Sequence, residues 1–547
     1  MKSTSRILAA VLLFVFVLFG SSSVFAQNSK KSTSTAAPAK PAPAAKPAPA
    51  VNASGPTKPP QPHVINPPKP PTPNPPRPPL VPKPTPLPPH VQVKQLPGNN
   101  NIQTRPDGSV RAIHDENRHM DVAHGLNGSR RISVERPDGT RIFAERGHPG
   151  YVEHPFNLHG HDFGRRTYFY QGRTYSRFYR PYTYRRVLID VYAPSRYYPF
   201  GFYGAVYGRW GQVAYAWGWG GAPWLGYYGY YFAPSAFYPS ASFWLTDYML
   251  SQDLAADYQA AQDSSRLAPE QAASGATELT ADVKQQIANE VAGQVELEYN
   301  EARQNAQNQN NPQNLDPDPA SSGIERMLGD GKTHVFVAGQ DLDLVDTTGN
   351  ECAVSGGDVL ALNTPPAPDA NAADLVVLAS KGGKECQKSD KVTVAYADLQ
   401  EMQNHMRETV DQGMEELRTK QGTGGLPAAP ASAQQPYADT AIAQFAPAQD
   451  ASASTEINEQ MQQGDAAEKE VTAQAGQENR AATSQTSIVP EAPGAAAPVS
   501  ISRGQSIDQV TGALGQPMRI VDLGAKKIYQ YRDMKITFRD GKVADVE

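Results

Sequence analysis

The sequence predicts a multi-domain chain that is largely disordered and carries small β-rich and α+β modules. Its 547 residues include 49 prolines and 44 glycines, and only 39% are hydrophobic, so much of the chain buries too little apolar surface to offset its ordering entropy. Short apolar runs separated by turn residues recur in the middle of the chain, which indicates a small sheet. A capped helix pattern followed by strand patterns ends the chain, which indicates an α+β module.

The first 26 residues are typical of a secretory signal peptide. Lys2 and Arg6 precede an apolar run over residues 7–19, and Ala26 completes a cleavage site before Gln27. As a helix this run spans only about 20 Å, against a hydrocarbon core of ~30 Å. We therefore expect export to the periplasm or outer envelope and no transmembrane segment in the mature chain. Retention of the segment as an anchor is the alternative.

Residues 27–100 are predicted to form a disordered cationic spacer. They hold 24 of the 49 prolines, and they contain lysine and arginine but no aspartate or glutamate. Proline runs of this kind adopt an extended polyproline conformation. The spacer is either a tether that crosses the periplasm or lies on an anionic polymer, or a plain solvated linker.

Residues 101–160 are predicted to form repeated β-hairpins. The motif RPDG occurs at 105–108 and again at 136–139, and each copy is followed by alternating apolar residues. Most histidines of the chain lie in this segment or directly after it: His114, His119, His124, His148, His154, His159 and His161. If His159 and His161 share one face of a strand they could chelate a metal, but tolerated surface histidines are the stronger interpretation, and we predict no metal site.

Residues 161–260 are rich in arginine, tyrosine, tryptophan and glycine, and they end in a predicted helix over 243–258. Three interpretations remain open: a platform for glycan or peptidoglycan, a surface that stacks nucleic-acid bases, or aromatics that pack on one another. Export argues against nucleic acid. The candidate contact residues are the aromatics Tyr215, Trp217, Trp219 and Trp224.

Residues 265–330 are predicted to be a polar helical and linker segment, with an apolar stripe every four residues from Leu279 to Tyr299. Residues 331–421 are predicted to hold five short strands followed by an amphipathic helix whose apolar stripe runs from Leu399 to Leu417. The strand pattern over 333–396 resembles bacterial SH3-like barrels. In an exported protein, two cysteines within one such segment predict a disulfide, here between Cys352 and Cys386.

Residues 422–499 are predicted to be a second disordered linker rich in alanine, glutamine and proline, with some helix near 466–475. Residues 500–547 are predicted to form a helix and a β-meander. Ser506 and Gln509 make a capping box, Gly515 ends the helix, and the run 534–538 alternates apolar and polar residues.

The pattern G-x-S-x-x-x-V-x-x-x-L-G-x-P followed by a meander resembles the SmpA/OmlA-type outer-membrane-assembly domain. Two departures are the missing N-terminal lipidated cysteine and the missing second helix. The resemblance implies binding without catalysis. The matching residues include four candidates for partner contact: Leu514, Tyr529, Tyr531 and Phe538.

Together these patterns predict an exported cell-envelope binding or scaffold protein that is not an enzyme. It would contact peptidoglycan or another envelope glycan, and an outer-membrane or envelope protein. No catalytic residue, metal ligand or cofactor is predicted, because no nucleophile–base pair and no glycine-rich phosphate loop stands out. The alternatives are an accessory factor for outer-membrane protein assembly and a secreted hydrolase.

Overall fold

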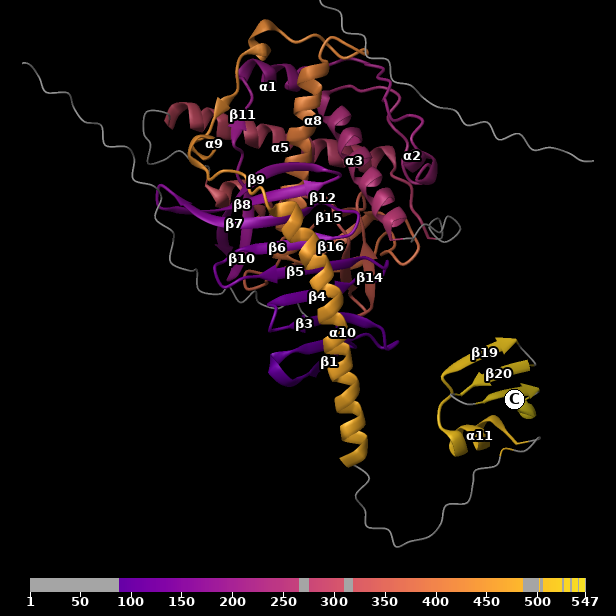
Figure 1. The fold of residues 1–547 in the computed structure, drawn as a ribbon. Helices are drawn as coiled ribbons and strands as arrows, with labels where there is room; N and C mark the ends of the chain where they lie inside the picture. The colour runs from indigo at the N-terminus through magenta and orange to yellow at the C-terminus, as the bar shows by residue number, and fades with distance from the viewer. Residues whose placement is uncertain are drawn as a thin grey trace, which may run out of the picture. The chain divides into compact units, whose positions relative to one another are not determined.

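The computed structural model describes residues 88–264, 275–308, 318–485 and 501–546, the last with gaps at 502–504, 524–525, 532–533 and 540. The chain divides into two compact units, Met1–Lys69 and Pro70–Glu547, and the first lies wholly outside the described residues. The expected signal peptide, most of the proline-rich spacer and the end of the second linker also lie outside them. The described residues form β-sheets and several helices (Figure 1).

A ten-stranded antiparallel meander forms the first part of the fold, with each strand paired to the next along the chain. The two predicted RPDG turns are present, with Gly108 and Gly139 at positive φ, and Gly128 closes an equivalent turn that the sequence analysis did not name. The strands are β1 (Gln92–Gln95), β2 (Asn101–Thr104), β3 (Val110–Asp115), β4 (Met120–His124), β5 (Arg130–Glu135), β6 (Arg141–Glu145), β7 (Gly150–Leu158), β8 (His161–Tyr170), β9 (Arg173–Tyr184) and β10 (Val187–Tyr192), with a short 3-10 turn η1 at Pro97–Asn99.

The sheet corrects the boundary that the sequence placed at residue 160. β7 pairs with β8 along its whole length, from Gly150 opposite Phe169 to Leu158 opposite His161. The composition changes at this point from aliphatic and histidine-rich to arginine- and tyrosine-rich, but the period-two alternation continues. Composition therefore suggested two segments where the backbone forms one sheet.

An aromatic core follows the sheet. It is built on α1 (Phe200–Tyr207), α2 (Pro223–Tyr227) and α3 (Ala241–Asp263), which includes the helix predicted over 243–258. The apolar stripe of α5 (Ala281–Asn308) packs into the same core, as its predicted pattern requires. The short pair of β11 (Arg196–Tyr197) with β18 (Ala438–Asp439) ties this region to a distant part of the chain.

A six-stranded sheet contains all five strands predicted in the middle of the chain, in the order β12-β15-β16-β17-β13-β14. Cys352 and Cys386 form the predicted disulfide within it. The predicted helix is α8, and its apolar stripe is buried. The identity of this region as an SH3-like barrel stays a prediction. Its elements are α6 (Pro319–Ser322), α7 (Ile324–Gly329), β12 (His334–Val337), β13 (Leu342–Asp346), β14 (Glu351–Val354), β15 (Val359–Leu362), β16 (Ala372–Ala379), β17 (Lys391–Ala395) and α8 (Tyr396–Lys420).

The prediction of a disordered linker over 422–499 is wrong for residues 422–485, which the structure describes. After η2 (Ala431–Gln434) and α9 (Ala441–Phe445), residues 453–485 form the long helix α10 (Ala453–Gln485), which crosses the strands of the ten-stranded sheet (Figure 1). Ile457 and Val471 pack on apolar side chains of the sheet such as Ile132. Alanine and glutamine are good helix formers, so the same composition that resembles a linker also suits a helix with a narrow apolar stripe.

The C-terminal module has the predicted order, with α11 (Ile507–Leu514) followed by β19 (Arg519–Leu523), β20 (Lys526–Gln530), β21 (Lys535–Arg539) and β22 (Lys542–Val546) as a meander. The capping box of Ser506 and Gln509 is present. The module has its own apolar core, centred on Ile536 and Phe538.

Candidate functional site

The predicted aromatic contact residues lie largely within the aromatic core. Trp217 stacks on Trp219 at 5.0 Å and on Trp244 at 4.9 Å between ring centroids, and its Nε1 donates a hydrogen bond to the hydroxyl of Tyr238 at 2.6 Å. Trp224 is buried. The ring faces that a sugar would need are therefore largely occupied by other rings.

Tyr215 completes the set of predicted aromatics. Its ring meets Trp217 edge-on at 4.9 Å and Trp244 at 5.6 Å, and it is half-buried. The four predicted residues therefore come together, but as one packed cluster rather than as an open row.

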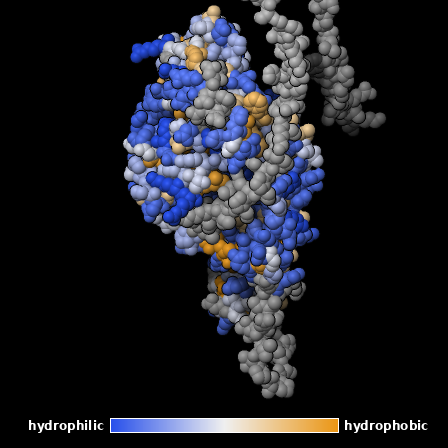
Figure 2. Space-filling view, turned by 90° about the vertical axis from the view of Figure 1, so that its left-hand side faces the viewer, coloured by the Kyte–Doolittle hydropathy of each residue, from blue (hydrophilic) through white to orange (hydrophobic). Residues whose placement is uncertain are grey.

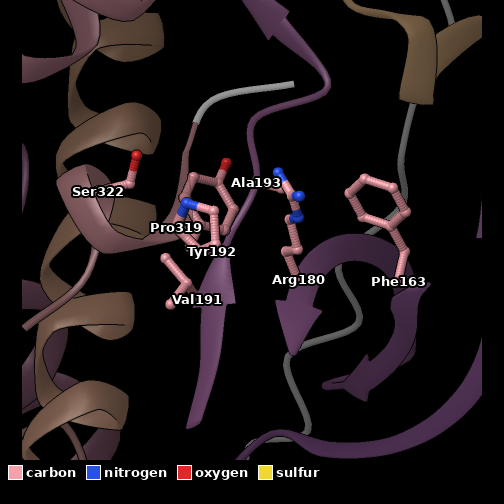
Figure 3. A pocket seen from close by; sticks show the side chains of 7 residues that line it. All are labelled: Phe163, Arg180, Val191, Tyr192, Ala193, Pro319 and Ser322. Carbon is pink, nitrogen blue, oxygen red and sulfur yellow. The ribbon is translucent and has the colours of Figure 1, made fainter. Parts of the chain in front are cut away.

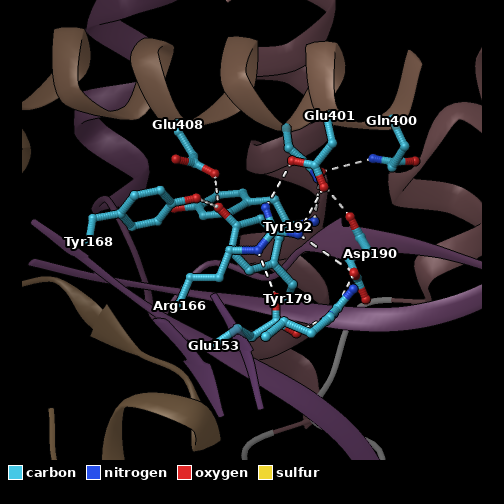
Figure 4. Close-up of polar contacts among 11 residues, drawn as sticks. Glu153, Arg166, Tyr168, Tyr179, Asp190, Tyr192, Gln400, Glu401 and Glu408 are labelled. Carbon is cyan, nitrogen blue, oxygen red and sulfur yellow. Dashed lines mark hydrogen bonds and ion pairs between the residues drawn. The ribbon is translucent and has the colours of Figure 1, made fainter. Parts of the chain in front are cut away.

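The arginine- and tyrosine-rich strands have an internal partner in α8 (Figure 4). Arg166 on β8 is only 3% exposed; its two terminal nitrogens each donate to Glu401 of α8 at 2.8 Å, and its Nε donates to Glu153 of β7 at 2.8 Å. The guanidinium also lies 3.9 Å from the ring centroid of Tyr179. Burial alone would lower the pKa of Arg166, but Glu401 raises it well above its usual value.

Further along α8, carboxylates continue to face this sheet. Glu408 accepts a hydrogen bond from the hydroxyl of Tyr179, which is 2.7 Å from the hydroxyl of Tyr168. Burial raises the pKa of Glu408, and the nearby Arg177 opposes that rise. The Arg/Tyr pattern that the sequence left open is therefore one half of a charge-complementary interface inside the molecule.

A second polar contact joins α8 to α3. His405 Nε2 lies 2.6 Å from Asp253 Oδ1, and Gly339 is close enough that any Cβ at that position would collide with the imidazole ring. Burial lowers the pKa of His405, but Asp253 outweighs this and the pKa is raised. The pair connects two helices and the loop after β12, which is a structural use of a histidine.

A buried lysine connects α3 to the six-stranded sheet next to the disulfide. Lys381 Nζ donates to the carbonyl oxygen of Gly356 at 2.7 Å and to Asp358 Oδ1 at 3.2 Å, and it lies 3.8 Å from both Asp257 and Glu385. Burial raises the pKa of Glu385 well above its usual range, and Asp358 adds to the effect. These groups are committed to holding two elements together.

A small cavity lies near the end of β10 (Figure 3). Its volume is about 10 Å³, which is room for about one water molecule and not for a substrate. The lining residues are Phe163, Arg180, Val191, Tyr192, Ala193, Pro319 and Ser322.

One group of metal-ligand types is buried together. Potential ligand atoms of Glu145, His148 and Asp341 all lie within 4.8 Å of one another. Both carboxylates make further interactions in the chain, so the geometry does not specify an ion. The weaker alternative of metal chelation by His159 and His161 assumed that both lie on one strand, and this assumption is wrong, because His159 and Gly160 form the positive-φ turn between β7 and β8.

The C-terminal candidates divide into two kinds. Phe538 is fully buried and its ring centroid lies 4.9 Å from that of the buried Tyr529, so both hold the core of the module. Leu514 and Tyr531 are half-buried at its margin. None of the four presents a fully exposed side chain to a partner.

Sequence reasoning missed the exposed apolar residues of this module. On the face drawn in Figure 2, hydrophobic residues form only small separate patches. Among the described residues, four of the eight exposed large hydrophobic side chains belong to the C-terminal module, and Met518 and Ile520 are the most exposed of these at 77% and 51%. The eight are Val93, Phe200, Phe237, Phe445, Met518, Ile520, Val521 and Val546.

Simple geometry explains the exposure of Ile520. It is paired with Tyr529, which in turn is paired with Ile536, so all three lie on the face that α11 covers. A helix is about 10 Å across, whereas four strands span about 14 Å, so one helix leaves an edge strand uncovered. The sequence pattern lacks the second helix that the resemblance implies, and this departure was the signal that could have identified this edge.

The two edges of the C-terminal sheet differ. The outer edge of β22 is partly covered by the chain before α11, where Val543 N donates to the carbonyl oxygen of Gln505 at 2.8 Å and Ser506 bridges to Lys542. In the described residues β19 pairs only with β20. The β19 edge therefore offers both free backbone groups and exposed apolar side chains, which is the combination that attracts an added strand.

No protein-family model matches the sequence, and neither a curated protein nor a solved structure matches it. Among the described residues, no helix combines the length and apolar character needed to cross a membrane.

Proposed function

We propose that the chain is an exported cell-envelope protein that binds and scaffolds without catalysis, and that it meets a protein partner at the β19 edge of its C-terminal module. The observation that carries this proposal is the exposure of Met518 and Ile520 beside an unpaired strand edge. Contiguous apolar exposure of this kind is typical of interaction sites. The envelope polymer that the sequence analysis expected would be a second contact.

The buried charges support a non-catalytic role for the rest of the chain. Arg166, His405 and Lys381 each connect separate elements through buried or half-buried carboxylates. Catalytic groups need access to a substrate, whereas these groups are occupied by one another. The predicted signal peptide and the disulfide between two cysteines support export.

The proposal is tested by affinity purification of the full mature chain from crosslinked envelopes. Ile520→Lys is compared with Phe237→Lys, because Phe237 is equally exposed at 54% but lies in the aromatic region. Both are surface changes expected to alter stability by less than about 0.5 kcal/mol. We expect Ile520→Lys to lose a defined protein partner at least tenfold and Phe237→Lys to retain it. Equal recovery with both variants would refute the β19 contact.

A second candidate is an accessory role in outer-membrane protein assembly. It is supported by the helix, capping box and meander of the C-terminal module, which have the order that the resemblance implies. In that case the partner lost in Ile520→Lys would be an outer-membrane barrel or a component that assembles one. The secreted hydrolase remains the weakest proposal, and peptide or glycan cleavage by the pure protein would support it.

A further inference from the structure

The face of the C-terminal sheet opposite to α11 carries aligned basic residues. The register pairs Lys526 of β20 with Arg539 of β21, and Arg539 with Lys542 of β22. Directly paired residues point to the same side of a sheet, so the three side chains stand in one row across three strands. Ile536 and Phe538, which alternate with this face on β21, are buried on the opposite side.

The three members of this row, which we call the basic row, are all exposed. None of them makes an ion pair with a carboxylate in the part of the chain that the structure describes. Adjacent strands are about 4.8 Å apart, so the three cations span roughly 10 Å. Arg519 stands on the same face, two rows away.

The basic row carries a cost that folding does not explain. Like charges directly opposite each other on neighbouring strands destabilise a sheet. On the ten-stranded sheet, by contrast, the buried cation of Arg166 is matched by Glu153 and Glu401. Three unmatched cations in register are therefore better explained by a ligand than by the stability of the module.

The shape and composition of the face select the class of ligand. The cations lie in one row across three neighbouring strands, so they suit a linear chain of regularly spaced negative charges. The described residues of this face include no aromatic side chain, whereas recognition of single-stranded nucleic acid relies on stacking. A polymer with one carboxylate or phosphate per repeat presents charges at a separation comparable to that of the strands.

We propose that the basic row of Lys526, Arg539 and Lys542 binds a linear anionic glycan of the envelope. This deepens the proposed function by assigning its polymer contact, and it rests on that function. It uses the face opposite to Met518 and Ile520, so the polymer and the protein partner bind to different surfaces of one module.

The test measures binding of the full mature chain to polygalacturonate over a range of salt concentrations. The variant Lys526→Gln/Arg539→Gln/Lys542→Gln is compared with Lys332→Gln/Lys384→Gln/Lys388→Gln, which removes three exposed lysines elsewhere and the same net charge. We expect the first variant to bind at least tenfold more weakly at low salt. The slope of log K against log salt should fall by about 2, because three ionic contacts to a flexible chain are lost.

The control variant should keep both the affinity and the slope, and so account for the contribution of net charge and of the cationic spacer. The basic-row variant should unfold at the same temperature as the wild type or higher, because it loses like-charge repulsion. Equal losses in the two variants would overturn the proposal. The proposal would also be overturned if the wild type bound phosphatidylglycerol vesicles through the basic row and did not bind the polymer.

The two proposals fail separately. If the basic row binds only the polymer, the basic-row variant loses polymer binding but still crosslinks to the protein partner of the β19 edge. If the partner is also lost in the basic-row variant, the two surfaces are one site and the polymer assignment is wrong.

Discussion

Two sheet faces in this molecule carry basic residues, and they are used differently. On the ten-stranded sheet, Arg166 lies under α8 and is matched by Glu153 and Glu401. On the outer face of the C-terminal sheet, Lys526 and Arg539 are exposed and unmatched in the described chain. The comparison teaches that alternating basic residues on strands do not by themselves indicate a ligand. What decides is whether another element of the chain supplies the opposite charge.

The largest expected effect is the loss of stability when Arg166 is removed from the ten-stranded sheet. Arg166→Ala leaves Glu401 without its cation and leaves Glu153 with Arg141 as its remaining cation in a largely buried site, and we expect a loss of about 3–5 kcal/mol in the free energy of unfolding. Denaturant unfolding of the full chain measures it. Arg173→Ala on β9 is the control, because that side chain is exposed, and it should change stability by less than about 0.5 kcal/mol. Similar values for both variants would show that the pairing of Arg166 with Glu401 does not stabilise the fold.

A second prediction concerns the pH dependence of stability that a buried glutamate on α5 causes. Burial raises the pKa of Glu298 on α5 to about 8, while a hydrogen bond from Tyr203 opposes the rise. A carboxyl whose pKa is raised by folding is stabilising when protonated, so its contribution is lost as pH rises from about 4.5 to about 8. The stability of the wild type should fall in that window with a limiting slope of about 1.4 kcal/mol per pH unit from this group.

The variant Glu298→Gln tests the assignment. It keeps an acceptor for Tyr203 and cannot ionise, so its free energy of unfolding should vary less steeply with pH over the same window. Equilibrium unfolding at pH 5, 6.5 and 8 provides the comparison. An unchanged slope would mean that another buried group causes the pH dependence.

A smaller effect is expected on the unmatched face. Arg539→Thr removes the central cation of the basic row and introduces a good strand former, so it should stabilise the module by about 0.2–1 kcal/mol. Hydrogen exchange of the amides of β21 in the full chain is the measurement, with Lys388→Thr as the control. Faster exchange in Arg539→Thr would show that this arginine is structural.

The smallest expected effect is the pH-dependent stabilisation by His114 on β3 of the ten-stranded sheet. A hydrogen bond to Asp121, supported by Glu116, raises the pKa of His114 to about 9 although partial burial opposes it. Its stabilisation is therefore complete below about pH 6.5 and lost as pH rises toward 9. Both carboxylates are largely exposed, so solvent screening limits the contribution to a few tenths of a kcal/mol. An NMR titration of His114 in the wild type and in Asp121→Asn checks the direction.

Much of the local structure could be predicted from the sequence. The capping box at Ser506 and the turns at Gly108 and Gly139 specify their own geometry, because the chemistry that defines them lies within four residues. The apolar stripe of α8 was equally local. Elements of this kind depend on no distant partner.

Long-range features were harder to predict. The contact of α10 with the sheet depends on residues more than 300 positions apart, such as Arg136 with Glu456, and its alanine-rich sequence is also typical of linkers. The aromatic cluster around Trp217 has the same composition whether it faces a sugar or other rings. The pairing of Arg166 with Glu401 spans 235 positions, so no local pattern connected the Arg/Tyr strands to α8.

The exposed β19 edge and the basic row could be predicted only in part from the sequence. Alternation correctly placed Ile536 and Phe538 on the buried face, but exposure of Ile520 depends on how far one helix reaches across four strands. The basic row depends on register, which shifts by one residue between Thr537 and Phe538 where β21 meets β22. Sequence periodicity does not show such a bulge.

The most direct test of the central claim is photo-crosslinking in cells. A photoreactive amino acid replaces Ile520 in one full-length chain and Phe237 in another, since both side chains are about half exposed. The account predicts a discrete adduct of higher mass from position 520 and none from position 237. An adduct from position 237 alone, or none from either position, would contradict the assignment of binding to the C-terminal module.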